Sequence, residues 1–406
     1  MEEWIRCNIG DVCNTISDTY RGDSDEVVLV NTSDVLDGKC MNHQKSPNKD
    51  LKGQFKKTFK RDDILYSEIR PANKRFAYID FDGTDYIAST KLMVIRHKEN
   101  IIPQFLYYII TSQAIIEELQ MLAESRSGTF PQITFTELAN LPIKLPSLSE
   151  QAKIVRFLKS LDDKIEVNRR INDNLEQQAQ ALFKSWFVDF DPFKDGEFVE
   201  SELGMIPNGW RVGTLNELGD IVGGSTPSKA KPEYYTNDGI AWLTPKDLSI
   251  SQRKFTSKGE IDITQEGYES CSTKLMPKGS VLFSSRAPIG YITIAKNNIC
   301  TNQGFKSVIP QFAGTAFLYC FLKESTQEIE NKATGSTFKE ASGTLMKSLP
   351  AIIPEKAVLD DFENLLNPLF YQQEVVEEEN SFLSSLLDSL LPRLMSGELN
   401  VSGINM

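Results

Sequence analysis

The sequence predicts an α+β protein: two tandem globular units of mixed helix and strand, related by a pseudo-two-fold axis and joined by two long antiparallel coiled-coil helices. Three observations predict this class. The chain has 406 residues, more than one hydrophobic core usually supports. Its two halves repeat each other, and each half ends in an apolar heptad stripe typical of a coiled-coil helix.

The repeat is clearest where the globular part of each half ends. SGTFPQITFTELANLPIKLPSLSEQAKIVRFL, from Ser127, aligns with GSTFKEASGTLMKSLPAIIPEKAVLDDFENLL, from Gly335, at a fixed offset of 208. Earlier patches match in the same order: ILYSEIRP (64–71) with VLFSSRAP (281–288), and FLYYII (105–110) with FLYCFL (317–322). Matches in a conserved order indicate a duplicated unit of roughly 200 residues.

The chain therefore divides into four parts. Residues 1–146 are expected to form the first globular unit, and 147–188 the first long helix. Residues 189–350 hold a linker rich in Asp, Gly and Pro and then the second unit, while 351–406 form the second long helix and a C-terminal tail. Within the units, VLFSS and YITIA predict strands, and FLYYIITSQAIIEELQML predicts an amphipathic helix.

Each long helix carries a narrow apolar stripe at alternating spacings of four and three, with polar residues near its middle. Pro368 interrupts the second stripe and predicts a kink or a later helix start. We expect the two stripes to pair with each other; the alternative is that each packs on its own globular unit. The predicted seam consists of Ile154, Leu158, Leu161, Ile165, Asn172, Leu175, Leu182, Leu366, Leu369, Val376, Asn380, Leu383, Leu387 and Leu390.

The composition excludes several classes of function. The chain has no run of 18 apolar residues and no basic, apolar leader, so we expect a cytoplasmic protein. Six cysteines without a CxxC pair and two isolated histidines argue against a metal site. There is no GxxxxGK[ST] loop and no Ser/His/Asp ordering. We therefore expect no catalysis by this chain.

Charge is unevenly distributed along the sequence. The net charge is −12, which alone argues against a nucleic-acid partner. Residues 351–406 carry −8 of it, whereas residues 39–75 carry eleven Lys and Arg against four acids, or +7. The acidic second helix is interpreted as a protein-docking or solvated surface. The basic stretch is a candidate binding surface.

Three motifs together carry a family resemblance. They are the repeated LP-x-x-x-P before each heptad helix, the LFKSWF end of the first helix, and SELGMIPNGWRVGTLNELGDIVGGSTPSKAKPEYY followed by GIAWLTPKDL. In these, the chain resembles the DNA-specificity subunit of a type I restriction–modification system over essentially its full length. The first unit departs from the pattern, with YRGDSDE (20–26) in place of GGSTPSK, and the second helix ends in LPRLMSGEL.

The resemblance implies a non-catalytic subunit. Each globular unit would be a target-recognition domain reading one half of a bipartite DNA site, and the helix pair would set the gap. Two methyltransferase subunits, and then motor–nuclease subunits, would bind the chain. S-adenosylmethionine, magnesium and ATP would belong to those partners, and none to this chain. A DNA-binding protein acting alone and a coiled-coil adaptor that binds only proteins remain as alternatives. A catalytic nuclease or methyltransferase is a third, disfavoured by the missing motifs.

Candidate DNA contacts follow from residue type, since Lys, Arg, Ser and Thr contact phosphates while Arg, Asn and Gln read base edges. Trp186, Phe187 and Phe190 are equally compatible with a methyltransferase-binding surface and with core packing. In the first unit the candidates are Lys56, Lys57, Lys60, Arg61, Arg70, Lys74, Arg75 and Arg126. In the second they are Ser225, Thr226, Ser228, Lys229, Lys246, Arg286, Asn302 and Gln303.

Overall fold

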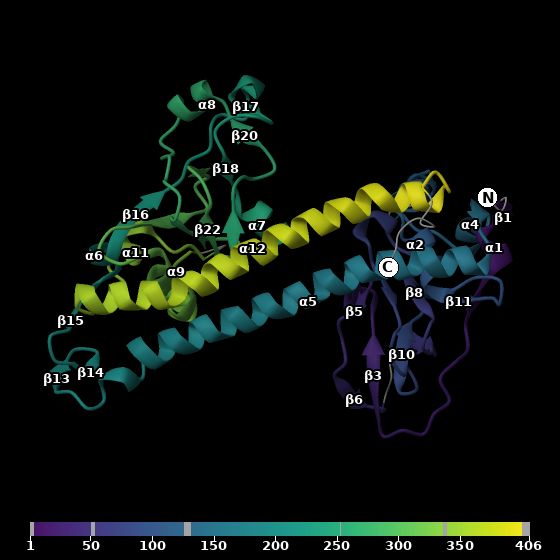
Figure 1. Cartoon of the computed structure of the whole chain (residues 1–406), viewed down its shortest axis with the longest axis horizontal. Helices are drawn as coiled ribbons and strands as arrows, with labels where there is room; N and C mark the ends of the chain where they lie inside the picture. Colours follow the sequence, from purple (N-terminus) through teal and green to yellow (C-terminus); the bar gives the residue numbers. More distant parts are fainter. Residues whose placement is uncertain (1–3, 50–52, 126–130, 252, 336–338, 400–406) are drawn as a thin grey trace. The chain divides into compact units, whose positions relative to one another are not determined.

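The structure, a computed structural model, describes residues 4–49, 53–125, 131–251, 253–335 and 339–399. The chain forms two compact units. Unit 1 is Met1–Ile165 with Phe382–Met406, and unit 2 is Glu166–Ser381. Two helices of 40 residues, α5 (Leu148–Phe187) and α12 (Lys356–Met395), each contribute one segment to either unit (Figure 1).

Unit 1 is built on two sheets. The first has the strand order β2 (Cys13–Ile16), β11 (Leu92–His97), β8 (Ile64–Ser67), β9 (Phe76–Tyr78). The second has the order β6 (Lys45–Pro47), β3 (Glu26–Val30), β10 (Tyr86–Ser89), β7 (Phe55–Lys57). Further pairs are β1 (Ile5–Asn8) with β12 (Pro142–Leu145), and β4 (Val35–Leu36) with β5 (Lys39–Cys40). The short helices are α1 (Ile9–Val12), α2 (Pro103–Ile110), α3 (Gln113–Glu124), α4 (Phe135–Ala139), η1 (Thr32–Asp34) and η2 (Pro71–Asn73).

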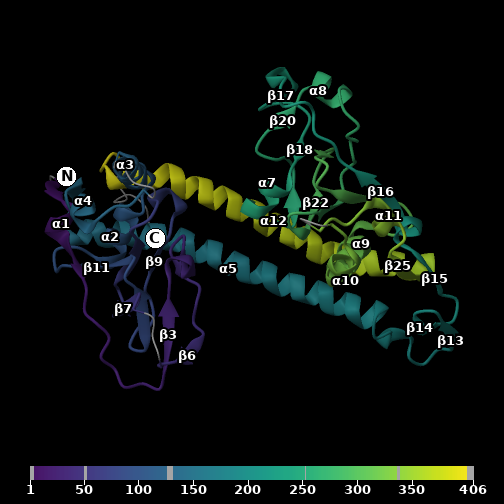
Figure 2. The ribbon, with the colours of Figure 1, turned by 180° about the vertical axis from the view of Figure 1, so that it is seen from behind.

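Unit 2 has one larger sheet with the order β16 (Gly219–Gly223), β24 (Lys306–Pro310), β21 (Val281–Ser285), β22 (Ile289–Ala295), β19 (Phe255–Thr256). Strand pairs are β13 (Phe198–Ser201) with β14 (Gly204–Pro207), β15 (Arg211–Thr214) with β25 (Pro350–Ile353), β17 (Tyr235–Thr236) with β20 (Asp262–Ile263), and β18 (Trp242–Leu243) with β23 (Cys300–Thr301). Its short helices are η3 (Asp191–Phe193), α6 (Leu215–Leu218), η4 (Pro232–Tyr234), α7 (Pro245–Ser251), α8 (Gln265–Glu269), α9 (Thr315–Glu324), α10 (Thr326–Lys332) and α11 (Gly343–Lys347). The β13–β14 hairpin follows the end of α5, and β17, β20 and α8 gather at the far end of the unit from β15 and β25 (Figure 2).

The predicted duplication is confirmed element by element. α4 and α11 span identical positions at the offset of 208, and β12 and β25 begin at the repeated Leu-Pro. The main-chain bond from Ile9 N–H to the Leu141 carbonyl (3.0 Å) returns as Leu215 N–H to Leu349 (2.9 Å). Each half therefore builds the same frame, in which the strand before its long helix pairs with the strand at its start.

The long helices exist because their apolar stripes are buried at both ends. In unit 1, the α5 residues Ile154 and Leu158 enter the core formed by β8, β11, α2 and α3, together with Leu394 of α12. In unit 2, Phe183 and Phe187 of α5 enter the core with Phe362 and Leu366 of α12. Burial on this scale outweighs the weak intrinsic stability of an isolated helix.

Both readings of the stripes are therefore partly correct, since each stripe packs on a globular unit as well as on the other helix. The helices run antiparallel where they meet in unit 2: Asn168 Nδ2 of α5 donates to Asn380 Oδ1 of α12 (2.9 Å), and Gln373 Nε2 donates to the Asn172 carbonyl (3.3 Å). Every predicted seam residue is buried or half-buried. Asn380 thus bonds Asn168, which lies one helical turn before the predicted seam residue Asn172.

Two expectations about the second helix are wrong: the later start at Pro368 and a helix that begins at residue 351. Helix α12 starts at Lys356 and runs through Pro368, so there is no late start. Leu366 and Phe370 are buried on either side of that proline, which offsets the lost backbone hydrogen bond. Residues 350–353 form β25 and do not belong to the helix. Two acidic residues of this helix, Glu363 and Glu377, accept backbone hydrogen bonds from within unit 2, and the interpretation of the acidic helix as a protein-docking or solvated surface stays a prediction.

The aromatic end of α5 belongs to the core of unit 2. Phe187 is buried, and Trp186 and Phe190 pack against the same core. Ring contacts join Phe187 to Phe362 with centroids 4.8 Å apart. Of the two interpretations of this cluster, core packing is confirmed. Within the described part of the chain, no helix combines the length and apolar character that crossing a membrane requires.

Candidate nucleic-acid interface

In unit 2 the predicted contact residues converge on the loop of Asn302, Gln303 and Gly304. The GGSTPSK segment (223–229) lies directly against this loop. A Cβ built on Gly224 would lie 2.1 Å from the Asn302 carbonyl oxygen, so only glycine allows this approach. Next to it, Ser225 N–H donates to the Thr301 carbonyl (3.0 Å), and the Thr226 hydroxyl donates to the Gln303 side chain.

Two more predicted segments reach the same loop. At the end of β21, Ser285 N–H donates to the Gly304 carbonyl (2.7 Å), which places Arg286 next in the chain. Pro245, the first residue of α7, lies against Gly304, and Lys246 follows it. Three segments that are separated in the sequence therefore meet at the loop of residues 302–304.

The charged groups of this surface are accessible. Lys229 and Ser228 are exposed, and so is Gln303. The Lys246 ammonium lies 2.8 Å from Glu260, but both side chains are about two-thirds exposed, so the pair is weakly held. Arg286 lies 3.5 Å from Glu340 in a pair whose side chains are a little over one-third exposed. Phosphate groups can compete for such ammonium and guanidinium groups.

Unit 1 repeats this arrangement at the end of β8. Glu68 N–H donates to the Lys91 carbonyl (3.0 Å), as Ser285 does to Gly304 in unit 2. Arg70 follows, with a left-handed φ of 44°, and the equivalent loop of unit 2 has Ala287 at 49°. Non-glycine residues rarely adopt this conformation, and they cluster at functional loops. Both loops pair with the chain just after the repeated SGTF or GSTF motif, at Gln132 and at Glu340.

A cluster of charges surrounds the unit 1 loop. The Lys57 and Lys91 ammonium groups lie 4.0 and 3.9 Å from Glu68, and Lys57 Nζ also donates to the Leu92 carbonyl (2.8 Å). Burial lowers the pKa of Lys57, and Glu68 counters that effect. Lys57 is thus held inside the domain, whereas Lys91 is half exposed. Sequence reasoning missed Lys91; the signal was its place, at the end of the strand before β11, equivalent to residues 302–304 before β24.

The structure divides the other unit 1 candidates into two groups. Lys74 and Arg75 lie near the Arg70 end of β8, where Arg75 carries the carbonyl that accepts from Ser67 N–H (2.8 Å). Lys60 and Arg61 precede the start of β8, about 13 Å away along a four-residue strand. Lys56 is exposed on β7, and as the strand neighbour of Lys57 it points to the opposite face. Arg126 lies outside the described residues.

Each unit therefore presents a loop with an arginine beside exposed lysine, hydroxyl or amide groups. The loop follows β8 in unit 1 and β21 in unit 2, and we call these two the central strands. Such groups bind phosphates and read base edges, and they do so without bond-making chemistry. Among the described residues, no group of three or more His, Cys, Asp or Glu is placed to hold a metal ion.

Comparison with known proteins places this arrangement in a family. The sequence profile described as type I restriction modification DNA specificity domain matches residues 1–177 and 207–376. The type I restriction enzyme HindI specificity subunit of Haemophilus influenzae is 34% identical, covering 98% of this chain and 100% of the relative. The MjaIX specificity subunit of Methanocaldococcus jannaschii is 39% identical over 192 residues, 45% of this chain and 44% of that protein.

The fold agrees as well. The S subunit of the type I restriction–modification system from M. genitalium superimposes with a TM-score of 0.53 at 16% identity, covering 97% of this chain and 96% of that one. Both copies of the family profile fall on the two halves of the internal repeat. The expected family, the duplicated architecture and the role of a non-catalytic specificity subunit are confirmed. The chain belongs to the family of type I restriction–modification DNA specificity subunits.

Proposed function

We propose that each unit reads one half of a bipartite DNA site through the loop at the end of its central strand. One observation carries this proposal. The same strand end in both units, after β8 and after β21, presents an arginine next to a loop with exposed cationic or amide groups. Because the loops around them differ in sequence, the two half-sites should differ as well.

The helix pair is proposed to set the gap between the half-sites. Each helix of 40 residues is about 60 Å long. Asn168 is fully buried, and its hydrogen bond to Asn380 is a contact of the kind that fixes the register of paired helices. In this proposal, a helix pair held in one register would keep the gap between the two half-sites constant.

Partners would supply the chemistry. We propose that two adenine methyltransferase subunits and, in a restricting complex, motor–nuclease subunits bind this chain. S-adenosylmethionine, Mg²⁺ and ATP would be held by those partners. We propose the cytoplasm as the location of the complex.

A genome-wide map of N6-methyladenine tests the proposal. The chain would be expressed with the methyltransferase gene encoded beside it, in a host without adenine methylation. The expected result is a split motif with two short specific parts around one gap length, absent when this chain is omitted. Methylation that is unchanged without the chain would overturn the proposal and favour the protein-only adaptor. DNA binding by the purified chain alone, without partner methylation, would favour the stand-alone DNA-binding protein.

A further inference from the structure

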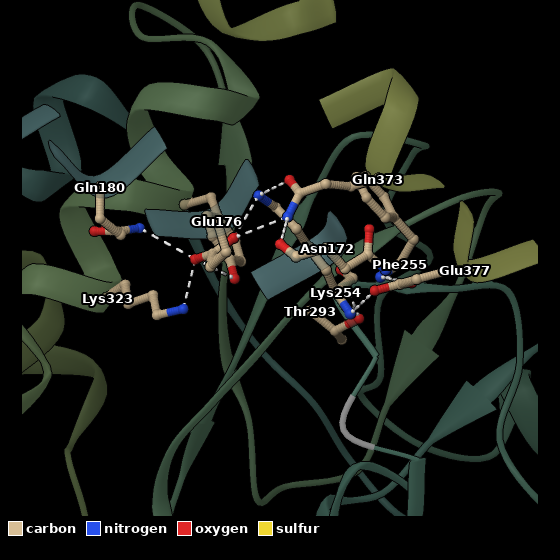
Figure 3. A network of polar contacts seen from close by, with 10 residues as sticks. Asn172, Glu176, Gln180, Lys254, Phe255, Thr293, Lys323, Gln373 and Glu377 are labelled. Carbon is tan, nitrogen blue, oxygen red and sulfur yellow. Dashed lines mark hydrogen bonds and ion pairs between the residues drawn. The ribbon is translucent and has the colours of Figure 1, made fainter. Parts of the chain in front are cut away.

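Lys254 is a buried cation that joins the recognition domain of unit 2 to both long helices. It lies immediately before β19, and its side chain is 5% exposed. Its ammonium donates to Glu176 Oε2 of α5 (2.8 Å) and to Gln373 Oε1 of α12 (2.7 Å) (Figure 3). We call Lys254, Glu176, Gln373 and Glu377 the Lys254 cluster.

The backbone around Lys254 is bound as firmly as its side chain. The N–H groups of Lys254 and Phe255 donate to the two carboxylate oxygens of Glu377 on α12 (2.9 and 3.2 Å). The Lys254 carbonyl accepts from Ile294 N–H (2.7 Å) and from the Thr293 hydroxyl (3.1 Å) of β22. The same residue is thus anchored in the sheet on one side and on two helices on the other.

Aromatic rings complete the site. The Lys254 ammonium lies 3.3 Å from the ring centroid of Phe370 and 4.3 Å from that of Tyr319, both favourable cation–π distances. The Tyr319 hydroxyl and the Lys323 ammonium both donate to Glu176 Oε1. Burial alone would raise the pKa of Glu176, but Lys254 and Lys323 lower it to about 2. The carboxylate is therefore charged at neutral pH.

Stability alone does not explain such a cluster. Buried ion pairs are often replaced by well-packed apolar side chains at no cost in stability. Their hydrogen bonds restrict the relative position of the groups, because a hydrogen bond weakens within a few tenths of an ångström and about 30° of its optimum geometry. Sliding one helix past the domain by a single residue moves a partner by about 1.5 Å, enough to break these bonds.

We propose that Lys254 is a positioning residue that fixes the second recognition domain on the helix pair and thereby keeps the gap between the two half-sites at one length. This inference rests on the proposed function. One base pair advances about 3.4 Å along B-DNA. A domain that slipped by two helix residues, about 3 Å, would therefore accept a gap that differs by one base pair.

The equivalent positions of unit 1 show that this cluster is not part of the duplicated frame. At the offset of 208, Gln373 corresponds to Ile165 and Glu176 corresponds to Ser384. The Lys254 cluster is thus a feature of unit 2 alone, and its removal should affect only the packing of the unit 2 recognition domain on the helices. Lys332, which pairs with Glu328 on the exposed face of α10, supplies a matched control in the same unit.

The test is the methylation map of variants assembled with the methyltransferase. Lys254→Met combined with Glu176→Gln removes the pair without leaving one buried charge alone. Gln373→Met removes the bond from the Lys254 ammonium to α12 and the Gln373 bond to the Asn172 carbonyl, while the ion pair and the Glu377 bonds remain. In both variants we expect unchanged half-site sequences. Methylation at sites whose gap is one base pair longer or shorter should rise about tenfold, which is comparable to the effect of one mismatched base pair on affinity. Lys332→Met should keep the single gap.

The outcomes separate the two proposals. If the wild-type chain gives no split motif, the proposed function fails, and the positioning role fails with it. If the wild type gives a fixed gap and folded variants keep it, the positioning role is overturned while the function stands. A purely structural role would lower total methylation at an unchanged gap, which also overturns it. Should the double variant not fold, Gln373→Met alone decides between these results.

Discussion

The two units attach their recognition domains to the long helices by different chemistry. In unit 1, Gln151 of α5 accepts from Ile102 N–H (2.8 Å) at the start of α2, and the Tyr108 hydroxyl donates to Asp162 (2.5 Å). In unit 2, a carboxylate replaces the amide, since Glu363 of α12 accepts from Phe317 N–H (2.8 Å) at the start of α9. The Lys254 cluster adds a buried ion pair to that unit.

The difference teaches that the duplicated frame and the polar attachments are separate properties. Most apolar positions of the two stripes are retained at one offset, with Ile165 against Gln373 as an exception, because burying a polar group without a partner is costly. The polar contacts need only satisfy local backbone groups. A neutral amide and a carboxylate can both do so, from different helices and different positions.

Breaking the buried ion pair should have the largest effect. Glu176→Gln leaves Lys254 without its counter-charge, which typically costs about 3–5 kcal/mol of unfolding free energy. Asp162→Asn in unit 1 should cost only about 1 kcal/mol, since burial already raises the pKa of Asp162 and an amide can still accept from Tyr108. Urea unfolding followed by tryptophan fluorescence measures the first, because three of the four tryptophans, Trp186, Trp210 and Trp242, lie in unit 2. Circular dichroism measures the second. Equal losses would contradict the contrast between the units.

The same pair predicts a pH dependence. The pKa of Glu176 is about 2 in the folded chain, below its ordinary value of 4.5. A lowered carboxyl pKa stabilises the folded state above the unfolded value, and this contribution is lost as pH falls through the folded one. The difference in unfolding free energy between wild type and Glu176→Gln should therefore shrink by about 3 kcal/mol between pH 4.5 and 2.

Titration of other groups does not affect this comparison. Burial raises the pKa values of Glu363 and Glu377, which has the opposite sign, but both residues are present in both proteins and cancel in the difference. Urea unfolding at a series of pH values gives the measurement. A difference that stays constant down to pH 3 would mean that the Glu176 carboxylate is not stabilised by its lysines.

Truncating a buried leucine at equivalent positions of the two helices should lower the free energy of unfolding by a similar amount in both units. Leu158 and Leu366 occupy equivalent positions at the offset of 208, and both are fully buried. We expect Leu158→Ala and Leu366→Ala each to cost about 2–5 kcal/mol, the usual range for truncating a buried leucine. Thermal unfolding by circular dichroism compares them. Losses that differ by much more than 1 kcal/mol would show that the frames are not equivalent.

Substitutions in the loops after β8 and β21 should have the smallest effects, and they should weaken DNA binding by similar amounts in the two units. Arg70→Ala and Arg286→Ala are each expected to weaken binding of the assembled complex to its site by about 1–3 kcal/mol. Lys60→Ala, at the opposite end of β8, serves as the control and should change binding little. Fluorescence anisotropy with a duplex carrying the mapped site, at one fixed salt concentration, checks this. A larger loss for the Lys60 variant would move the interface to the other end of the strand.

The sequence by itself determined the frame of this protein. Local sequence patterns predict the repeat at a fixed offset, the two heptad stripes and the Leu-Pro boundary. Such patterns can be recognised in a single sequence because each helix or strand must bury one face. The family motifs and the absence of catalytic motifs led to the same identification.

Only the tertiary structure decided which polar groups act together. Lys60 and Arg70 are ten residues apart and lie at opposite ends of one strand, while Thr226 and Gln303 meet across 77 residues. Glu176, Lys254 and Gln373 come from three distant segments, and no spacing rule relates them. Polar contacts are made by chain segments that the apolar core brings together, so their partners follow from packing and cannot be derived from local sequence.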